Sequence, residues 1–205
     1  MVVGFLVLGG LIIYLILTLI LVWVGTRYAR KRGKPGWKGG VPVLVIMYLL
    51  LFWDLIPTHA VHRYYCATEG GFTVNKSLEQ WKAENPGVTA TLEPIKNAPW
   101  IATGEKTRIP LNQRFAWDRY ERRHLFGVRE REERIVDTET GETLARYVDF
   151  DTDIRAVERG IEARGLRDYK FWLATESCER AGQNMPKRKF NEFYHLLKYQ
   201  EEIDL

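Results

Sequence analysis

The stretch 54-DLIPTHAVHRYYC-66 places a carboxylate, two imidazoles and a thiol within thirteen residues. If a helix runs through it, His59, His62 and Cys66 lie at i, i+3 and i+7 on one face, which is the spacing that a metal site requires. A structural zinc site needs four ligands, and Asp54 is separated from the other three by a proline. The same stretch also fits a membrane exit that is followed by one half of a disulfide.

Two apolar segments precede this stretch. Residues 2–24 are uncharged, and a helix of 23 residues at ~1.5 Å per residue exceeds the ~30 Å of hydrocarbon in a bilayer. Residues 41–53 form a second apolar run, which reaches 17 residues, the low end of spanning length, if it continues to Pro57. We therefore expect residues 1–57 to form a transmembrane hairpin of two helices.

Positive charge is concentrated between the two apolar runs. Residues 1–57 hold six basic side chains and one acid, whereas residues 58–205 hold 24 basic and 25 acidic ones. The six basic residues of the first part all lie within residues 25–40: Arg27, Arg30, Lys31, Arg32, Lys34 and Lys38. The calculated pI of about 9.0 thus reflects one loop, and we expect no nucleic acid as a partner.

This loop also predicts the topology. Basic residues close to helix ends are retained on the cytoplasmic side, so we expect residues 25–40 in the cytoplasm of a bacterial cell, the helices in the inner membrane and both chain ends in the periplasm. A cleaved signal peptide is the competing interpretation, but 1-MVVGF has no basic residue and the apolar run is long. The lipid bilayer is therefore an expected partner.

Cysteine usage agrees with this topology. The chain has two cysteines, Cys66 and Cys178, and neither lies in an apolar run. Two thiols in a domain that faces an oxidising compartment most economically form one disulfide. Closing such a long loop would stabilise the domain by up to ~4 to 5 kcal/mol. A sulfur in a disulfide is no longer a thiolate ligand, so we favour the disulfide and expect no metal.

The remaining polar groups at the membrane exit then have a simple interpretation. His59 and His62 would be polar groups that face lipid headgroups. Asp54 would lie at the interface with Arg63 within reach, because it stands only three residues before Pro57.

Residues 58–205 predict an α+β domain with an antiparallel sheet and helices packed on it. The expected elements are a short helix at 58–67, a strand at 71–75, a helix capped by 77-SLEQ-80, a hairpin of 134–136 and 143–150 around 137-DTETG-141, a helix at 152–164, a strand at 169–178 and a last helix from about Pro186. In the second hairpin strand, Leu144, Arg146, Val148 and Phe150 alternate with Ala145, Tyr147 and Asp149, so one face is mostly apolar.

The run 118-DRYERRHLFGVREREER-134 alternates charges of both signs. One interpretation is a surface for a partner or an acidic ligand, formed by Arg122, Arg123, Arg129 and Arg131. The other is the solvated face of an exposed strand pair, on which Arg and Glu opposite one another stabilise modestly. We favour the second.

Three segments together resemble a scattered group of uncharacterised bacterial membrane-anchored proteins: 62-HRYYCATEGGFTVNKS-77, 133-ERIVDTETGETLARYVDF-150 and 171-FWLATESC-178. In that group a Cys precedes a Gly-containing strand, a D-T-x-T-G-E hairpin follows, and a second Cys closes an aromatic strand. The resemblance implies an envelope domain with a bond between Cys66 and Cys178, and it implies no activity.

The sequence thus favours a non-enzymatic envelope protein, anchored in the inner membrane, that contacts another membrane or periplasmic protein as an accessory or assembly subunit. It contains no GxxxxGK[ST], GxSxG or HExxH motif, and we expect no cofactor. One alternative is a metal-dependent or enzymatic periplasmic module around His59, His62 and the arginine-rich strands. Another is an exclusion or immunity-type membrane protein of a mobile element. The oligomeric state does not follow from the sequence.

Overall fold

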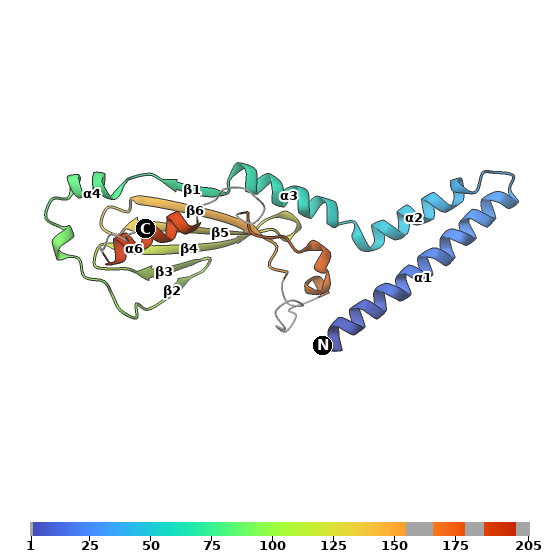
Figure 1. Cartoon of the computed structure of the whole chain (residues 1–205), viewed down its shortest axis with the longest axis horizontal. Coiled ribbons are helices and arrows are strands. Elements are labelled where there is room, and N and C mark those ends of the chain that lie inside the picture. The colour runs from blue at the N-terminus through green and yellow to red at the C-terminus, as the bar shows by residue number, and fades with distance from the viewer. Residues whose placement is uncertain (1, 155–165, 179–186, 200–205) are drawn as a thin grey trace. The chain divides into compact units, whose positions relative to one another are not determined.

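The computed structural model describes residues 2–154, 166–178 and 187–199 (Figure 1). By its internal contacts the chain divides into two compact units. The first consists of Met1–Pro57 and Ile154–Leu173, and the second of Thr58–Asp153 and Ala174–Leu205.

The first unit contains two long helices, α1 (Val2–Lys31) and α2 (Trp37–Phe52). Among the described residues, the part of α1 from Val7 to Lys31 is the one helix long and apolar enough to cross a membrane by itself. The helix α2 passes the same test only together with α3 (Leu55–Thr68), across a bend. The fold therefore supports one candidate membrane helix near the N-terminus.

The helices α1 and α2 approach each other closely at two glycines. A Cβ added at Gly25 would lie 2.8 Å from the carbonyl oxygen of Gly39, and a Cβ at Gly39 would lie closer still to the carbonyl oxygen of Gly25. Both distances are shorter than van der Waals contact. A larger residue at either position would push the two helices apart.

The second unit is an α+β domain with a six-stranded antiparallel sheet, which confirms the predicted fold class. The strand order is β1-β6-β5-β4-β3-β2. The strands are β1 (Gly71–Val74), β2 (Ile101–Thr103), β3 (Lys106–Pro110), β4 (Phe115–Arg123), β5 (Arg129–Asp137) and β6 (Thr143–Asp151). Its helices are α3, of which the larger part belongs here, α4 (Leu78–Glu84), α6 (Lys187–Tyr199) and the 3₁₀ turns η1 (Thr89–Thr91) and η2 (Leu125–Gly127).

Several local predictions are confirmed. The hydroxyl of Ser77 accepts from the backbone N–H of Gln80, and the Gln80 side chain accepts from the backbone N–H of Ser77, so α4 begins with the predicted capping box. The strands β5 and β6 form the predicted hairpin, with Gly141 at φ 75° in its turn. The last helix begins at Lys187 and buries Phe190 and Leu197.

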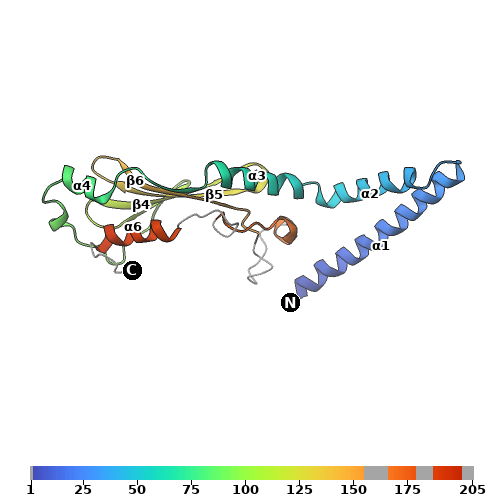
Figure 2. The ribbon, with the colours of Figure 1, turned by 45° about the horizontal axis from the view of Figure 1, so that its top comes forward.

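The two faces of the sheet differ in what lies on them. Figures 1 and 2 show α6 across one side of the sheet, which we call the covered face. There Phe190 and Leu197 of α6 join a cluster of buried apolar side chains that includes Ile135, Ala145 and Tyr147 of the sheet. The opposite side, which we call the open face, carries nine polar or aromatic side chains: Lys106, Arg108, Asp118, Tyr120, Arg122, Glu130, Glu132, Arg134 and Arg146.

The alternation in β6 was therefore interpreted wrongly. Both faces of this strand hold buried apolar side chains, because each is covered by a different element. Ala145 and Tyr147 pack beneath α6, whereas Val148 and Phe150 form a second cluster with Cys66 of α3 at one corner of the open face. A strand covered on both sides need not show a single apolar face.

The predicted strand at 169–178 is also wrong. The chain forms two short 3₁₀ turns, η3 (Leu166–Tyr169) and η4 (Phe171–Leu173), followed by irregular backbone to Cys178. The backbone N–H of Thr175 donates to Thr152 Oγ1 and that of Cys178 donates to Asp149 Oδ1, at 3.0 and 2.9 Å. Side chains thus satisfy these backbone groups in place of a neighbouring strand. The helix predicted at 152–164 lies almost wholly outside the described residues.

Candidate functional site

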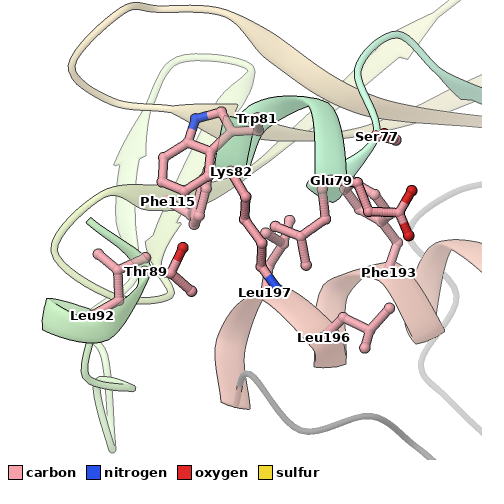
Figure 3. Close-up of a pocket in the computed structure, with 11 residues that line it drawn as sticks. Ser77, Glu79, Trp81, Lys82, Thr89, Leu92, Phe115, Phe193, Leu196 and Leu197 are labelled. Carbon is pink, nitrogen blue, oxygen red and sulfur yellow. The ribbon is translucent and has the colours of Figure 1, made fainter. Parts of the chain in front are cut away.

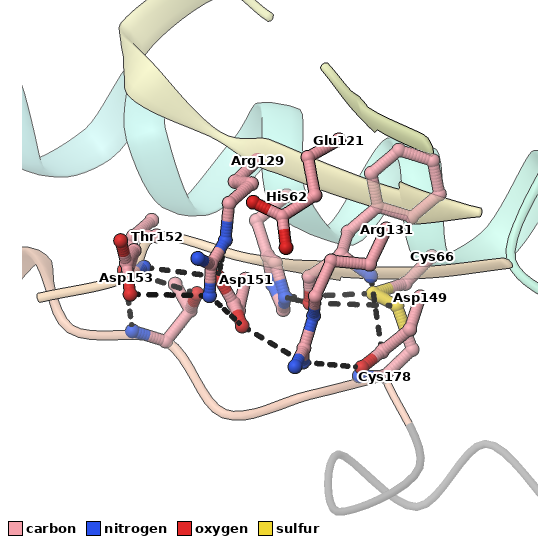
Figure 4. A network of polar contacts seen from close by, with 12 residues as sticks. His62, Cys66, Glu121, Arg129, Arg131, Asp149, Asp151, Thr152, Asp153 and Cys178 are labelled. Atoms are coloured by element: carbon pink, nitrogen blue, oxygen red, sulfur yellow. Dashed lines mark hydrogen bonds and ion pairs between the residues drawn. A yellow bond between two sulfur atoms is a disulfide. The ribbon is translucent and has the colours of Figure 1, made fainter. Parts of the chain in front are cut away.

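The helix α3 buries three residues one turn apart, Thr58, His62 and Cys66. The sulfur atoms of Cys66 and Cys178 lie 1.94 Å apart, at disulfide distance, and both residues are buried (Figure 4). The Nε2 atom of His62 lies 3.1 Å from the carbonyl oxygen of Phe150 and 3.5 Å from Cys66 Sγ. The pair of Cys66 and Cys178 therefore joins α3 to the segment that follows η4.

These contacts cover the part of the β6 edge that does not pair with β1. The strand β1 pairs with β6 only as far as Val148, so beyond that point the edge of β6 has no neighbouring strand. His62 contacts the carbonyl oxygen of Phe150 at this edge, and the backbone N–H of Cys178 bonds the Asp149 side chain. Without these contacts, buried backbone groups at the edge of β6 would be left unpaired. The sulfur pair therefore holds α3 and the Cys178 segment against this edge.

The predicted exposure of His62 to lipid headgroups is wrong, because only 5% of this residue is exposed. Its Nε2 and the sulfurs of Cys66 and Cys178 are the one group of three metal-type ligands among the described residues, and they lie within 4.8 Å of one another. While the two sulfurs are bonded to each other, this group offers only one imidazole nitrogen. His59 is half-buried and does not belong to it.

Asp54 belongs to the first unit and is paired there. Lys170 Nζ lies 2.6 Å from Asp54 Oδ2, and Asp54 is only 9% exposed. The expected partner Arg63 is therefore replaced by a residue much later in the chain. Near Lys170, the rings of Phe52 and Trp172 meet edge to face at 5.1 Å.

The four arginines of the predicted interaction surface do not form one surface. Arg129 and Arg131 point to the covered face and are held by a line of aspartates (Figure 4). Arg129 contacts Asp151 and Asp153 at 3.0 and 3.1 Å, and Arg131 contacts Asp149 and Asp151 at 2.9 and 2.8 Å.

Burial raises the pKa of the Asp149 carboxyl above its usual value, although the Cys178 N–H and Arg131 oppose this. Arg123, at the end of β4, is exposed. Of the four predicted arginines, Arg122 is the one that belongs to the network on the open face.

The open face is not the solvated strand pair that we favoured, because its acids are buried. Glu132 has no exposed surface, and its carboxylate contacts three guanidinium groups, those of Arg122, Arg134 and Arg146. Burial acts to raise the pKa of this carboxyl, but the hydrogen bonds from Arg134 and Arg146 outweigh it and hold the pKa below its usual range.

Asp118 repeats this arrangement on the neighbouring strands. Both carboxylate oxygens accept from Arg108, at 2.6 and 2.7 Å, and Lys106 Nζ lies 2.8 Å away. Burial acts to raise its pKa, and here too the two cations outweigh burial and lower it. Glu130, the third buried acid, contacts Arg122 at 3.2 Å and His124 at 2.7 Å.

Tyr120 lies among these cations. The guanidinium carbons of Arg134 and Arg122 lie 4.9 and 5.5 Å from its ring centroid, and Lys106 Nζ lies 5.6 Å from it. Each distance is within the range of a cation–π contact. The open face thus combines an aromatic ring, five cations and three carboxylates in fixed contacts.

A cavity of about 320 Å³ lies elsewhere in the second unit, between α4 and α6 (Figure 3). Its walls are mainly apolar and include Leu78 and Trp81 of α4, Phe115 of β4 and Phe193 of α6. Lys82 and Glu79 lie at its border. The cavity could accept an apolar group, but the described residues place no cluster of catalytic groups in it.

Lys106, Arg108, Tyr120, Arg134 and Arg146 were missed when the sequence was interpreted. The turn at 137-DTETG-141 could not reveal the pairing of Arg134 with Arg146, because a bulge between Ile135 and Val136 shifts the register that a regular hairpin would have. Arg134 lies directly opposite Arg146.

No family model, no curated protein and no solved structure matches this chain. The assignment of a function therefore rests on the chemistry of its own residues.

Proposed function

We propose that this protein is a non-enzymatic subunit of the bacterial cell envelope, anchored in the inner membrane by residues 1–57. Residues 58–205 would lie in the periplasm and contact another membrane or periplasmic protein. The observation that carries this proposal is the pair Cys66 and Cys178, at disulfide distance in a chain that also has a candidate membrane helix. Disulfides persist in oxidising compartments such as the periplasm.

Two further features support a membrane hairpin with a cytoplasmic loop. The described loop between α1 and α2 contains only basic charges, which favours the cytoplasmic side. The close approach of α1 and α2 at Gly25 and Gly39 is typical of helices that associate inside a bilayer, where small residues let two backbones come together. In this arrangement α2 completes its span with the first residues of α3.

An interaction role agrees with the chemistry of the domain. The cations of the open face are organised around buried carboxylates, and Arg and Tyr are enriched where proteins bind each other. The imidazole nearest to the sulfur pair contacts a backbone carbonyl and is enclosed by the fold. A binding role requires only the exposed cations of the open face and no catalytic group.

The topology is tested with fusions to alkaline phosphatase, which is active only in the periplasm. A fusion after Leu205 should be active, and a matched fusion after Lys34, in the basic loop, should be inactive. The reverse pattern would contradict the topology and the reason for expecting a disulfide. Purification from mild detergent should in addition recover a stoichiometric partner.

A further inference from the structure

The open face is ordered by the pairing of its strands. Arg108 lies opposite Asp118, Asp118 opposite Arg134, and Arg134 opposite Arg146, so these four residues form one row across β3, β4, β5 and β6. Directly opposite residues are ~4.5 to 5.5 Å apart at their Cα atoms. The row therefore reads cation, anion, cation, cation.

The last two members of this row form a like-charge pair. Like charges directly opposite one another in a sheet are destabilising. Arg134 and Arg146 share the carboxylate of Glu132, and both donate to its Oε1 atom through Nε. The terminal guanidinium nitrogens of Arg134 and Arg146 donate no hydrogen bond to the described residues. The two guanidinium groups therefore lie side by side with these nitrogens open to a ligand.

The whole face also has more cations than anions. Its five cations lie over three carboxylates, and each cation keeps 33–41% of its side chain exposed. The next acid, Glu105, is 70% exposed and lies 4.0 Å from Arg122, so it neutralises little. Two positive charges therefore remain in excess on a surface that water can reach.

We propose that this face binds an acidic segment of a partner protein, with one carboxylate bridging Arg134 and Arg146. The inference rests on the proposed interaction role and names the chemistry of the partner. Paired guanidinium forks match the two oxygens of a carboxylate, and clusters of arginine recognise acidic motifs in proteins.

An acidic protein segment fits better than an anionic membrane surface. A membrane requires only positive charge, whereas here Glu132 and Asp118 hold the cations in fixed positions, three of them around the ring of Tyr120. Such an arrangement is suited to a ligand with its own fixed geometry, and the ring of Tyr120 offers it an apolar contact.

Binding is tested on the full chain in neutral detergent micelles, by calorimetric titration with a short synthetic peptide of alternating glutamate and glycine. The same peptide with glutamine in place of glutamate should not bind. The double variant Arg134→Gln and Arg146→Gln should lose affinity by about tenfold or more, since it removes charge-assisted hydrogen bonds. The matched control Arg188→Gln and Lys189→Gln changes net charge equally on exposed positions of α6 and should change affinity less than about twofold.

A charge-conserving variant separates recognition from simple attraction. Arg134→Lys with Arg146→Lys keeps both charges but removes the forks, and it should also lose about tenfold in affinity. Unchanged binding by this variant would overturn the proposal. So would equal losses in the Gln pair and the α6 control.

Competing ligands give the remaining outcomes. If vesicles with phosphatidylglycerol bind through Arg134 and Arg146 and the peptide does not, the face binds membranes and the proposal is wrong. Inorganic phosphate that binds as tightly as the peptide would also overturn it. Failure of the peptide to bind leaves the fusion results unaffected, so the two proposals fail separately.

Thermal unfolding excludes a purely structural role. Removing both arginines leaves Glu132 buried with Arg122 as the one cation that contacts it among the described residues, so the Gln pair should lower the melting temperature whether or not the face binds a ligand. The measurement that separates the two roles is the rise in melting temperature on adding the peptide, which should be present in the unmodified chain and in the α6 control and absent in the Gln and Lys pairs. An equal rise in all four proteins would contradict the proposal.

Discussion

The two faces of the sheet are built from the same strands, yet they treat buried charge in opposite ways. On the open face the pKa values of Asp118 and Glu132 are lowered, because their arginine and lysine partners outweigh burial. On the covered face burial dominates at two groups, whereas at Arg129 the contact with Asp151 outweighs burial and raises the pKa of the guanidinium. Burial raises the pKa of Asp149 and lowers that of Lys187, although Glu133 opposes the shift of the lysine.

The difference follows from the number of donors and from the access of water. Glu132 contacts three arginines, of which Arg122 is shared with Glu130, and each remains about one-third exposed or more. Asp149 shares Arg131 with Asp151, under the segment that leads to Cys178. The pKa of a buried acid is thus lowered where cations are in excess, and it is raised by burial where a cation is shared between two acids.

The largest expected effect is the loss of stability when a buried aromatic ring is removed from the covered face, compared with removal of Tyr120 from the open face. Phe190→Ala removes a fully buried ring from the contact of α6 with Phe72 and Tyr147 and should reduce the free energy of unfolding by ~3 to 5 kcal/mol. Tyr120→Ala on the open face should cost less than about 1.5 kcal/mol, since it removes mainly cation–π contacts. Urea unfolding followed by tryptophan fluorescence measures both, and equal losses would remove the distinction between the faces.

The cover over the edge of β6 beyond Val148 depends on the sulfur pair. Cys178→Ser should reduce stability by ~2 to 5 kcal/mol and make the Cys66 thiol reactive to alkylation. Because the Cys178 N–H bonds Asp149, hydrogen exchange should become faster near that end of β6 and change little at β3. Alkylation of both thiols in the untreated oxidised protein would show that the pair is not bonded.

A third comparison exchanges one acid on each face for its neutral amide. Glu132→Gln leaves three arginines without their shared carboxylate and should cost roughly 2 to 4 kcal/mol. Asp149→Asn should cost less than Glu132→Gln, about 1 kcal/mol, since burial works against the ionised carboxyl and the amide oxygen can still accept from Cys178. A larger loss in Asp149→Asn would reverse our account of the two faces.

The pH dependence should have opposite signs on the two faces. The folded pKa of Glu132 lies below its ordinary value of 4.5, so its contribution is present above that pH and is lost as the pH falls further. The folded pKa of Asp149 lies above 3.8, so its unfavourable contribution disappears as the pH falls through the folded value.

In urea titrations between neutral pH and pH 3, stability should therefore fall less steeply in Glu132→Gln than in the unmodified chain. It should fall more steeply in Asp149→Asn. Identical slopes in all three proteins would show that neither carboxyl is shifted.

The sequence predicted the elements whose signals are local. The capping box at Ser77, the turn that ends at Gly141 and the apolar positions Phe190 and Leu197 all depend on residues a few positions apart. The cysteine pairing was predictable for another reason, since two cysteines allow only one intramolecular pair.

The pairing of residues on the open face depends on a bulge that no pattern in the sequence indicates. A bulge between Ile135 and Val136 shifts the register of β5 against β6, and it is this shift that places Arg134 opposite Arg146. Without it, Arg134 would lie opposite Ala145 and the like-charge pair would not form. The error at 169–178 had a different cause. Aromatic residues favour strands, but 166–169 and 171–173 form 3₁₀ turns, and the Cys178 N–H donates to the Asp149 side chain and not to the backbone of β6.

The sulfur pair also has a consequence for how the protein is made. Its members are 112 residues apart, and a ribosome that adds 5–20 residues per second needs roughly 6 to 22 s to synthesise that length. During this interval Cys66 has emerged without its mate, while the edge of β6 that the pair covers cannot yet be closed. The growing chain therefore passes through a period in which a free thiol and an uncovered strand edge are present together, and an oxidant or chaperone would act at that time.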